Sequence, residues 1–123
     1  MILADTSIWT DHLRSPSPEF AVRLAVREIL MHPFVVGELA LGNLPARANF
    51  LADLSDMPKA TVAEDREVLR MIETNGLNGS GIGWVDAHLI ASARLFAATA
   101  LWTRDKRMFA VSQSLGIPTA GLH

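Results

Sequence analysis

The sequence contains no cysteine, no long apolar run and no excess of positive charge. Without cysteine, disulfides, thiolate catalysis and sulfur-ligated zinc are all excluded, and the chain suits a reducing compartment. No apolar stretch is long enough to span a bilayer, and Met1 leads directly into a short apolar segment, so we expect neither a membrane span nor a signal peptide. We therefore expect a cytoplasmic protein. The net charge of −2 argues against a broadly basic nucleic-acid binder, so nucleic-acid contacts must be local or assisted by a metal ion.

The length of 123 residues suits one domain, 1–123, with a substantial core. Half of the residues are hydrophobic and the mean hydropathy is +0.24. This richness indicates either a well-filled core or an apolar surface that packs against a partner, and composition alone does not separate the two. Self-association as a homodimer would follow from the second interpretation.

Short apolar segments alternate with helical patterns along the chain, which predicts an α/β fold with a mostly parallel central sheet flanked by helices. Helical spacing begins after residue 5 and again near residue 20. We then expect an apolar segment over 34–44, helices over 47–54, 64–72, 84–98 and 106–115, and a glycine-rich loop over 75–83. Strands are expected at 2–4, 29–31, 59–62, 100–103 and 117–119.

Two aspartates stand where a buried strand ends and a helix begins. Asp5 follows the strand at 2–4, and Asp105 follows the strand at 100–103. Ligands of open α/β sheets bind beyond the carboxyl ends of the strands, so neighbouring strands would bring both acids to one rim. Taken singly, either residue is better explained as the cap of the helix that follows it.

Glu38 and Asp86 change this balance because both stand in apolar surroundings. Glu38 is the only charge in the segment 34–44, and Asp86 points where a core residue would point. An isolated ionised carboxylate is costly there unless it is paired or binds a metal, and no basic residue lies one turn away on either helix. We therefore expect Asp5, Glu38, Asp86 and Asp105 to share a divalent cation. All-oxygen ligation favours Mg²⁺ or Mn²⁺ over zinc.

The histidines do not suggest a zinc site. His88 follows Asp86 by two residues and so faces elsewhere on the helix, and the other three histidines are scattered and typical of surface or capping positions: His12, His32 and His123. The loop at 75–83 follows a helix and lacks the Walker lysine, so it is not a phosphate loop. Trp102 belongs in the core, whereas Trp84 at a helix start can be either packed or free to stack on a base.

Four segments, in this order and setting, resemble the PIN-domain ribonucleases, and above all the VapC toxins of bacterial toxin–antitoxin pairs. They are Asp5-Thr6-Ser7, Val36-Gly37-Glu38-Leu39, Gly83-Trp84-Val85-Asp86-Ala87-His88-Leu89 and Leu101-Trp102-Thr103-Arg104-Asp105. The resemblance extends from Met1 to about Thr119.

This resemblance implies a Mg²⁺- or Mn²⁺-dependent endoribonuclease, a toxin that acts on RNA and is inhibited by a VapB-like antitoxin. It implies catalytic and metal-binding roles for the four acids, and supporting roles for the hydroxyls of Thr6 and Thr103. Many relatives carry a further acid two positions after the last aspartate, where this chain has Arg107. That difference argues against a well-formed second metal site.

The chemistry agrees with the resemblance. Phosphodiester hydrolysis needs a nucleophilic water and a stabilised leaving oxygen, and a divalent ion supplies both by lowering the pKa of bound water and neutralising phosphate charge. Arg104, Lys106 and Arg107 flank Asp105 and can bind neighbouring phosphates. A solvated helix start explains these three basic residues equally well.

Three other classes of protein fit less well. A phospho-receiver module needs an acidic pair after the first strand, but Asp5 is followed by Thr6. A haloacid-type phosphatase needs a second aspartate in the same motif. A catalytically silent binding protein with the same fold would not need four unpaired carboxylates.

Overall fold

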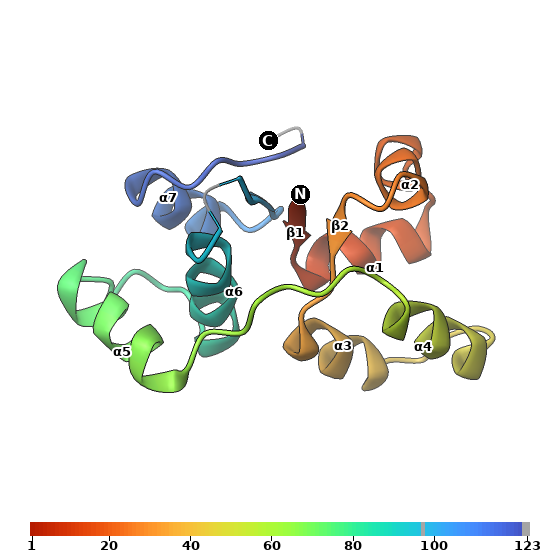
Figure 1. Ribbon diagram of the computed structural model, residues 1–123, viewed down its shortest axis with the longest axis horizontal. Helices are drawn as coiled ribbons and strands as arrows, with labels where there is room; N and C mark the ends of the chain where they lie inside the picture. Colours follow the sequence, from red (N-terminus) through yellow and green to blue (C-terminus); the bar gives the residue numbers. More distant parts are fainter. Residues whose placement is uncertain (97, 122–123) are drawn as a thin grey trace.

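The computed structural model describes residues 1–96 and 98–121 and contains a three-stranded parallel sheet in the order β2-β1-β3 with helices around it (Figure 1). The predicted α/β class with a parallel sheet is confirmed. The elements, in chain order, are β1 (Ile2–Ala4), α1 (Thr6–Arg14), α2 (Pro18–Ala25), β2 (Ile29–Leu30), α3 (Pro33–Ala40), α4 (Arg47–Ser55), α5 (Asp65–Thr74), α6 (Trp84–Arg94), β3 (Ala100–Trp102) and α7 (Lys106–Ser114).

The central strand β1 pairs with both of its neighbours over its short length. Leu3 lies opposite Leu30 of β2 and Leu101 of β3. Because the three strands are parallel, their carboxyl ends meet at one rim of the sheet. The expected strands at 59–62 and 117–119 are reduced to isolated bridges, which join Met31 to Lys59 and Leu101 to Thr119.

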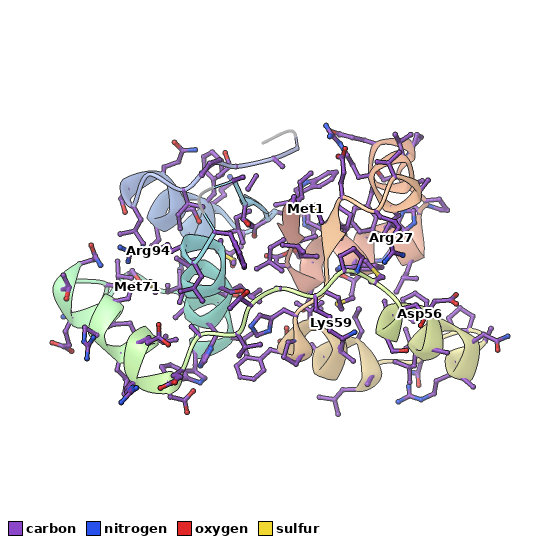
Figure 2. The ribbon with its side chains drawn as sticks, in the orientation of Figure 1. Met1, Arg27, Asp56, Lys59, Met71 and Arg94 are labelled. Atoms are coloured by element: carbon purple, nitrogen blue, oxygen red, sulfur yellow. The ribbon has the colours of Figure 1, made fainter. Side chains whose placement is uncertain are left out.

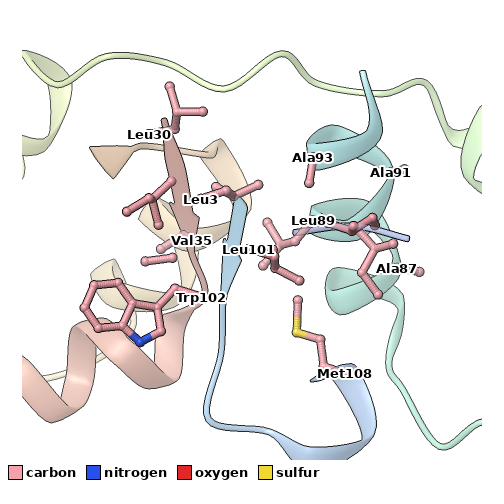
Figure 3. Packing of buried hydrophobic residues seen from close by; sticks show 14 of the residues in the cluster. Leu3, Leu30, Val35, Ala87, Leu89, Ala91, Ala93, Leu101, Trp102 and Met108 are labelled. Atoms are coloured by element: carbon pink, nitrogen blue, oxygen red, sulfur yellow. The ribbon is translucent and has the colours of Figure 1, made fainter. Parts of the chain in front are cut away.

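The sheet is buried on both faces, as its all-apolar strands require. Figure 3 shows Leu101 pointing toward Leu89 of α6 and Met108 of α7, while Trp102 points to the opposite face. There the ring of Trp102 lies 5.6 Å from that of Phe20, whose ring is 4.9 Å from that of Trp9. All six side chains are nearly inaccessible to solvent, so the core position predicted for Trp102 is confirmed.

Several helix bounds differ from expectation. The helix that begins at Trp84 ends at Arg94 instead of continuing to residue 98, and Ala97 lies outside the described residues. The segment 34–44 is helical only to Ala40, since the glycine and asparagine that follow are poor helix formers. No helix in the described ranges is long and apolar enough to cross a membrane.

His32 is a buried cap at the start of α3. Its Nδ1 accepts a hydrogen bond of 3.0 Å from the backbone N–H of Phe34, and its side chain is fully buried. Burial, and secondarily the nearby His88, lower the pKa of His32 to about 4 from the usual 6.5. The folded chain therefore holds a neutral imidazole where the unfolded chain takes up a proton.

Lowering the pH from 6.5 to 4 should destabilise the protein through this histidine. Only the unfolded chain gains a proton in that interval, so the free energy of unfolding falls as the pH falls, by up to about 3 kcal/mol. His32→Asn keeps a capping acceptor but does not titrate, so urea unfolding of the variant should depend less steeply on pH. Equal slopes for parent and variant would show that His32 is not the group responsible.

Candidate active site

The carboxyl rim of the sheet is where the four predicted acids come together. β1 runs directly into α1 at Asp5, β3 runs through Thr103 to Asp105 at the start of α7, and α3 begins just beyond β2 (Figure 1). Asp86 lies in the first turn of α6 and Glu38 in the second turn of α3. Two helix N-caps, Asp5 and Asp105, and two helical residues, Glu38 and Asp86, therefore lie at one rim.

The carboxylate of Asp5 is buried and is held by several hydrogen bonds. It is 5% exposed, and it caps α1 by accepting a hydrogen bond of 3.3 Å from the Ile8 N–H at Oδ1. The hydroxyl of Ser7 also donates to Oδ1, and the buried hydroxyl of Thr103 donates to Oδ2. These three donors hold the carboxylate in one orientation.

Thr103 connects two of the acids. While donating to Asp5, its Oγ1 accepts a hydrogen bond of 3.0 Å from the backbone N–H of Asp105. Asp105 in turn caps α7, because its Oδ1 accepts from the N–H groups of Arg107 at 2.8 Å and Met108 at 3.0 Å. Thr103 therefore links the side chain of Asp5 to the backbone of Asp105, and its supporting role stays a prediction.

Glu38 and Asp86 are less enclosed than expected. Glu38 is exposed, so the expectation that it stands in apolar surroundings is wrong; its Oε1 accepts a hydrogen bond from the hydroxyl of Thr6. Asp86 is half-buried and its Oδ2 accepts a hydrogen bond of 3.3 Å from the Gly83 N–H. A helix face that looks apolar in sequence can still lie at a rim open to solvent.

The charges of the four acids influence one another. Burial raises the pKa of Asp86, and the charges of Asp105, Asp5 and Glu38 raise it further, while the Gly83 hydrogen bond opposes them. Among residues 1–96 and 98–121, no lysine, arginine or histidine forms an ion pair with any of the four. The cluster thus carries negative charge that no described side chain neutralises.

The oxygens of this cluster fit a hard divalent cation. Glu38, Asp86 and Asp105 each have one oxygen held by a hydrogen bond, and within the described part of the chain their second oxygen has no donor. Free carboxylate oxygens are ligands that Mg²⁺ and Mn²⁺ prefer. As they are placed, no three or more acids or histidines of the described ranges form a group that could hold a metal ion. The free oxygens therefore suit such an ion by their chemical type, but their positions do not by themselves make a metal site.

The three basic residues that flank Asp105 differ in their surroundings. The Nε of Arg104 lies 3.3 Å from Oδ2 of Asp11, in a largely exposed ion pair of the kind that contributes little stability. Lys106 and Arg107 line an open hollow of about 470 Å³ between α7 and the loop that follows α5. A Cβ at Gly81, where φ is +88°, would lie 2.7 Å from Cδ of Arg107. Glycine at 81 therefore lets Arg107 lie against this loop.

Sequence reasoning missed two residues at the rim. Ser7 belongs to the Asp5-Thr6-Ser7 motif but has no predicted role, yet its hydroxyl donates to Asp5 and accepts a weak hydrogen bond of 3.4 Å from the Arg104 N–H. Asp11 holds the side chain of Arg104. For Ser7 a signal was present, because a hydroxyl two residues after an acid at a helix start commonly bonds to it; for Asp11 there was none.

The histidines have other partners. The buried His88 lies 2.9 Å, through Nε2, from Oδ1 of Asp65. His12 accepts a hydrogen bond of 3.0 Å from the Ser17 N–H, and His123 lies outside the described residues.

Comparison with known proteins agrees with this geometry. Residues 2–113 match the PIN domain family. The chain is also 40% identical over 120 residues to Ribonuclease VapC32 of Mycobacterium tuberculosis strain CDC 1551, with 98% of this chain and 97% of the relative covered. The protein of the same name from strain H37Rv matches to the same extent. The chain therefore belongs to the PIN-domain family, within which it is similar to the VapC ribonucleases.

Proposed function

We propose that this protein is a Mg²⁺- or Mn²⁺-dependent endoribonuclease. The observation that carries the proposal is the cluster of Asp5, Glu38, Asp86 and Asp105 at the carboxyl rim. Burial first, and then the charges of the other three acids, raise the pKa of Asp86, and no described cation forms an ion pair with any of the four. The similarity to Ribonuclease VapC32 supports RNA as the substrate. A divalent ion held by these acids would activate water and neutralise charge on the scissile phosphate.

The protein's own residues orient the cluster before any substrate arrives. Thr103 and Ser7 fix the carboxylate of Asp5, and Thr6 fixes one oxygen of Glu38. Preorganised donors of this kind do not have to be rearranged during the reaction. Since Glu38 and Asp105 are exposed, the rim is open enough to admit a polymer.

Basic side chains beside the rim suit the polyanionic substrate. Lys106 and Arg107 line a hollow on the outer side of α7, and the Arg104 side chain can leave its exposed pair with Asp11 at little cost. We assign these three residues to phosphates that flank the scissile one. The arginine at 107 brings positive charge to a position where many relatives carry an acid, which favours a site with one metal ion.

The metal requirement is the direct test of this function. The purified protein should cut RNA in the presence of Mn²⁺ or Mg²⁺ and stop when EDTA is added, because the divalent ion activates the attacking water and neutralises charge on the phosphate. Adding Mn²⁺ in excess of EDTA should restore cleavage. Cleavage that continues at the full rate in EDTA would contradict the proposal, and labelling of the protein by acetyl phosphate would favour a phospho-receiver instead.

The similarity to VapC proteins also supports a role as the toxin of a toxin–antitoxin pair, acting in the cytoplasm as a homodimer bound by a VapB-like antitoxin. A groove of about 380 Å³ lies between α3, α4 and the segment that follows α4. Lys59, labelled in Figure 2, is one of its lining residues. Its apolar lining includes Met31, Val36, Leu51 and Val62. An apolar antitoxin segment would fit this groove.

A charge placed in this groove should weaken antitoxin binding. Val62 is 47% exposed on the groove wall, so Val62→Glu should lower the affinity for the protein encoded beside this chain's gene by about tenfold or more, because binding would bury an unpaired carboxylate. Val22→Glu, at a 62% exposed position on α2, is the matched control and should bind normally. Titration calorimetry gives the affinities, and light scattering gives the oligomeric state. Equal affinities for both variants would place the antitoxin elsewhere.

A further inference from the structure

Trp84 is the one tryptophan that the fold leaves open to solvent. It is 42% exposed, whereas Trp9 and Trp102 are 2% and 6% exposed. It is the first residue of α6 and precedes Asp86 by two positions. A large aromatic side chain exposed this close to a candidate active site indicates a binding surface.

The indole of Trp84 packs against other aromatic rings of the protein. Its centroid lies 4.8 Å from the ring of His88 in an edge-on arrangement, and the His88 ring lies 4.7 Å from that of Phe34. His88 is 1% exposed and is fixed by its contact with Asp65. The indole is therefore braced by a packed column of rings, and little side-chain entropy would be lost when a partner binds to it.

Next to the indole is a hollow of the size and polarity that a nucleobase needs. It has a volume of about 210 Å³ and is lined by Trp84, by Ile72 and Leu77, and by the loop 78–83. Three glycines of this loop line the hollow without any side chain over their backbone, and the amide of Asn78 can both donate and accept. An aromatic wall opposite hydrogen-bonding groups is the usual setting for an unpaired base.

The hollow is joined to the acid cluster through one residue. Gly83 lines the hollow, and its N–H donates to Oδ2 of Asp86. Gly81 also lines the hollow, and Arg107 lies against it. A base in the hollow would thus have its phosphate near a cation and its chain directed toward the carboxylates.

We propose that Trp84 and the loop 77–83 form a subsite for an unpaired base that flanks the scissile phosphate. This inference rests on the proposed ribonuclease function and adds a requirement to it, namely that the RNA be single-stranded at the flanking nucleotide. A protein partner on the indole is the competing occupant. The polar loop, the adjacent Arg107 and the link to Asp86 favour a nucleotide.

Trp84 fluorescence reports binding directly. In an Asp5→Asn background, which does not cleave, a short single-stranded oligoribonucleotide should quench tryptophan emission, because a base stacks on the only exposed indole in the described chain. A perfect RNA duplex should quench little. A change of emission that depends on protein concentration without RNA would show that the indole contacts a second copy, and would overturn the proposal.

Kinetics on the active protein complete the test. Trp84→Ala should raise KM about tenfold or more with a smaller change in kcat, and Trp84→Phe should recover part of the loss. An abasic site at the flanking nucleotide should cost the parent a similar factor but cost Trp84→Ala little more, since both changes remove one contact. Leu69→Ala, at an exposed position on α5 that does not line the hollow, should match the parent.

The outcomes separate the two proposals. If the parent cleaves RNA while Trp84→Ala and the abasic substrate both leave KM unchanged, the base subsite is wrong and the ribonuclease function stands. If the parent fails to cleave any RNA with Mn²⁺ or Mg²⁺, the ribonuclease function fails, and the subsite fails with it. The abasic substrate requires no substitution, so its result does not depend on the folding of a variant.

Discussion

Asp5→Asn should lower the rate of RNA cleavage on the order of a thousandfold while leaving the fold intact. The carboxylate is the most buried of the four acids and is oriented by hydroxyl donors on both oxygens. Asparagine has nearly the same shape but lacks the charge that would hold a divalent ion, and such an ion contributes several kcal/mol of transition-state stabilisation. Initial rates on a defined RNA, with circular dichroism of the variant, measure both effects.

Asp53→Asn provides the matched control for this substitution. Asp53 is an exposed aspartate on α4, outside the acid cluster, so its replacement should change neither rate nor fold. Asp105→Asn should resemble Asp5→Asn, because Asn can still cap α7 but brings no charge to the rim. Undiminished cleavage by both cluster variants would refute the assignment of the site.

The positions of Asp5 and Asp105 could be predicted because their signal is local. Each follows a strand too apolar to lie anywhere but in a buried sheet, and parallel strands of one sheet end at one rim. The α/β class and the core position of Trp102 follow from the same pattern. A short apolar run that ends at a carboxylate is therefore enough to predict, from the sequence, that the carboxylate lies at this rim.

Glu38 lies at this rim, but not for the reason that its apolar neighbours in the sequence suggest. Its helix is apolar on most sides, but at residue 38 it faces solvent, so burial does not explain the residue. What holds Glu38 at the rim is a hydrogen bond from Thr6, thirty-two residues earlier. Helical periodicity indicates which residues share a face, but it cannot indicate which element that face meets.

Contacts between distant segments explain the other differences. The pairing of Arg104 with Asp11, and the contact of Arg107 with Gly81, join parts of the chain that no spacing rule connects. The expected strand at 59–62 forms only a bridge. The segment lies beside β2, at the edge of the three-stranded sheet, and therefore has a neighbour on one side only. Edge segments have fewer partners and their extent depends on the rest of the fold.

Asp86→Asn should have opposite effects on stability in EDTA and in Mn²⁺. In EDTA the variant should melt at a higher temperature than the parent, because burial and the charges of Asp105, Asp5 and Glu38 disfavour the ionised carboxylate. In Mn²⁺ the parent should gain about 4 kcal/mol at a thousandfold excess of ion over its dissociation constant, since the ion binds only the folded state. The variant should gain much less.

The pH dependence gives the sign of the first effect independently. Because the folded-state pKa of Asp86 is raised above the ordinary 3.8, the folded chain binds this proton more tightly than the unfolded chain. The stability contributed by the protonated carboxyl is present at low pH and is lost as the pH rises through the folded-state pKa. The advantage of Asp86→Asn in EDTA should therefore be largest at neutral pH and should vanish below 3.8.

A simple capping role for Asp86 leads to different results. Asp86 lies in the first turn of α6, where a negative charge is favoured by the helix dipole, so loss of that charge alone would lower the melting temperature slightly and leave the response to Mn²⁺ intact. Melting curves of the parent, Asp86→Asn and the control Asp53→Asn, each with EDTA and with Mn²⁺, distinguish the two roles. A variant that kept the full Mn²⁺-induced shift would remove Asp86 from the metal site, whereas the control should keep that shift in either case.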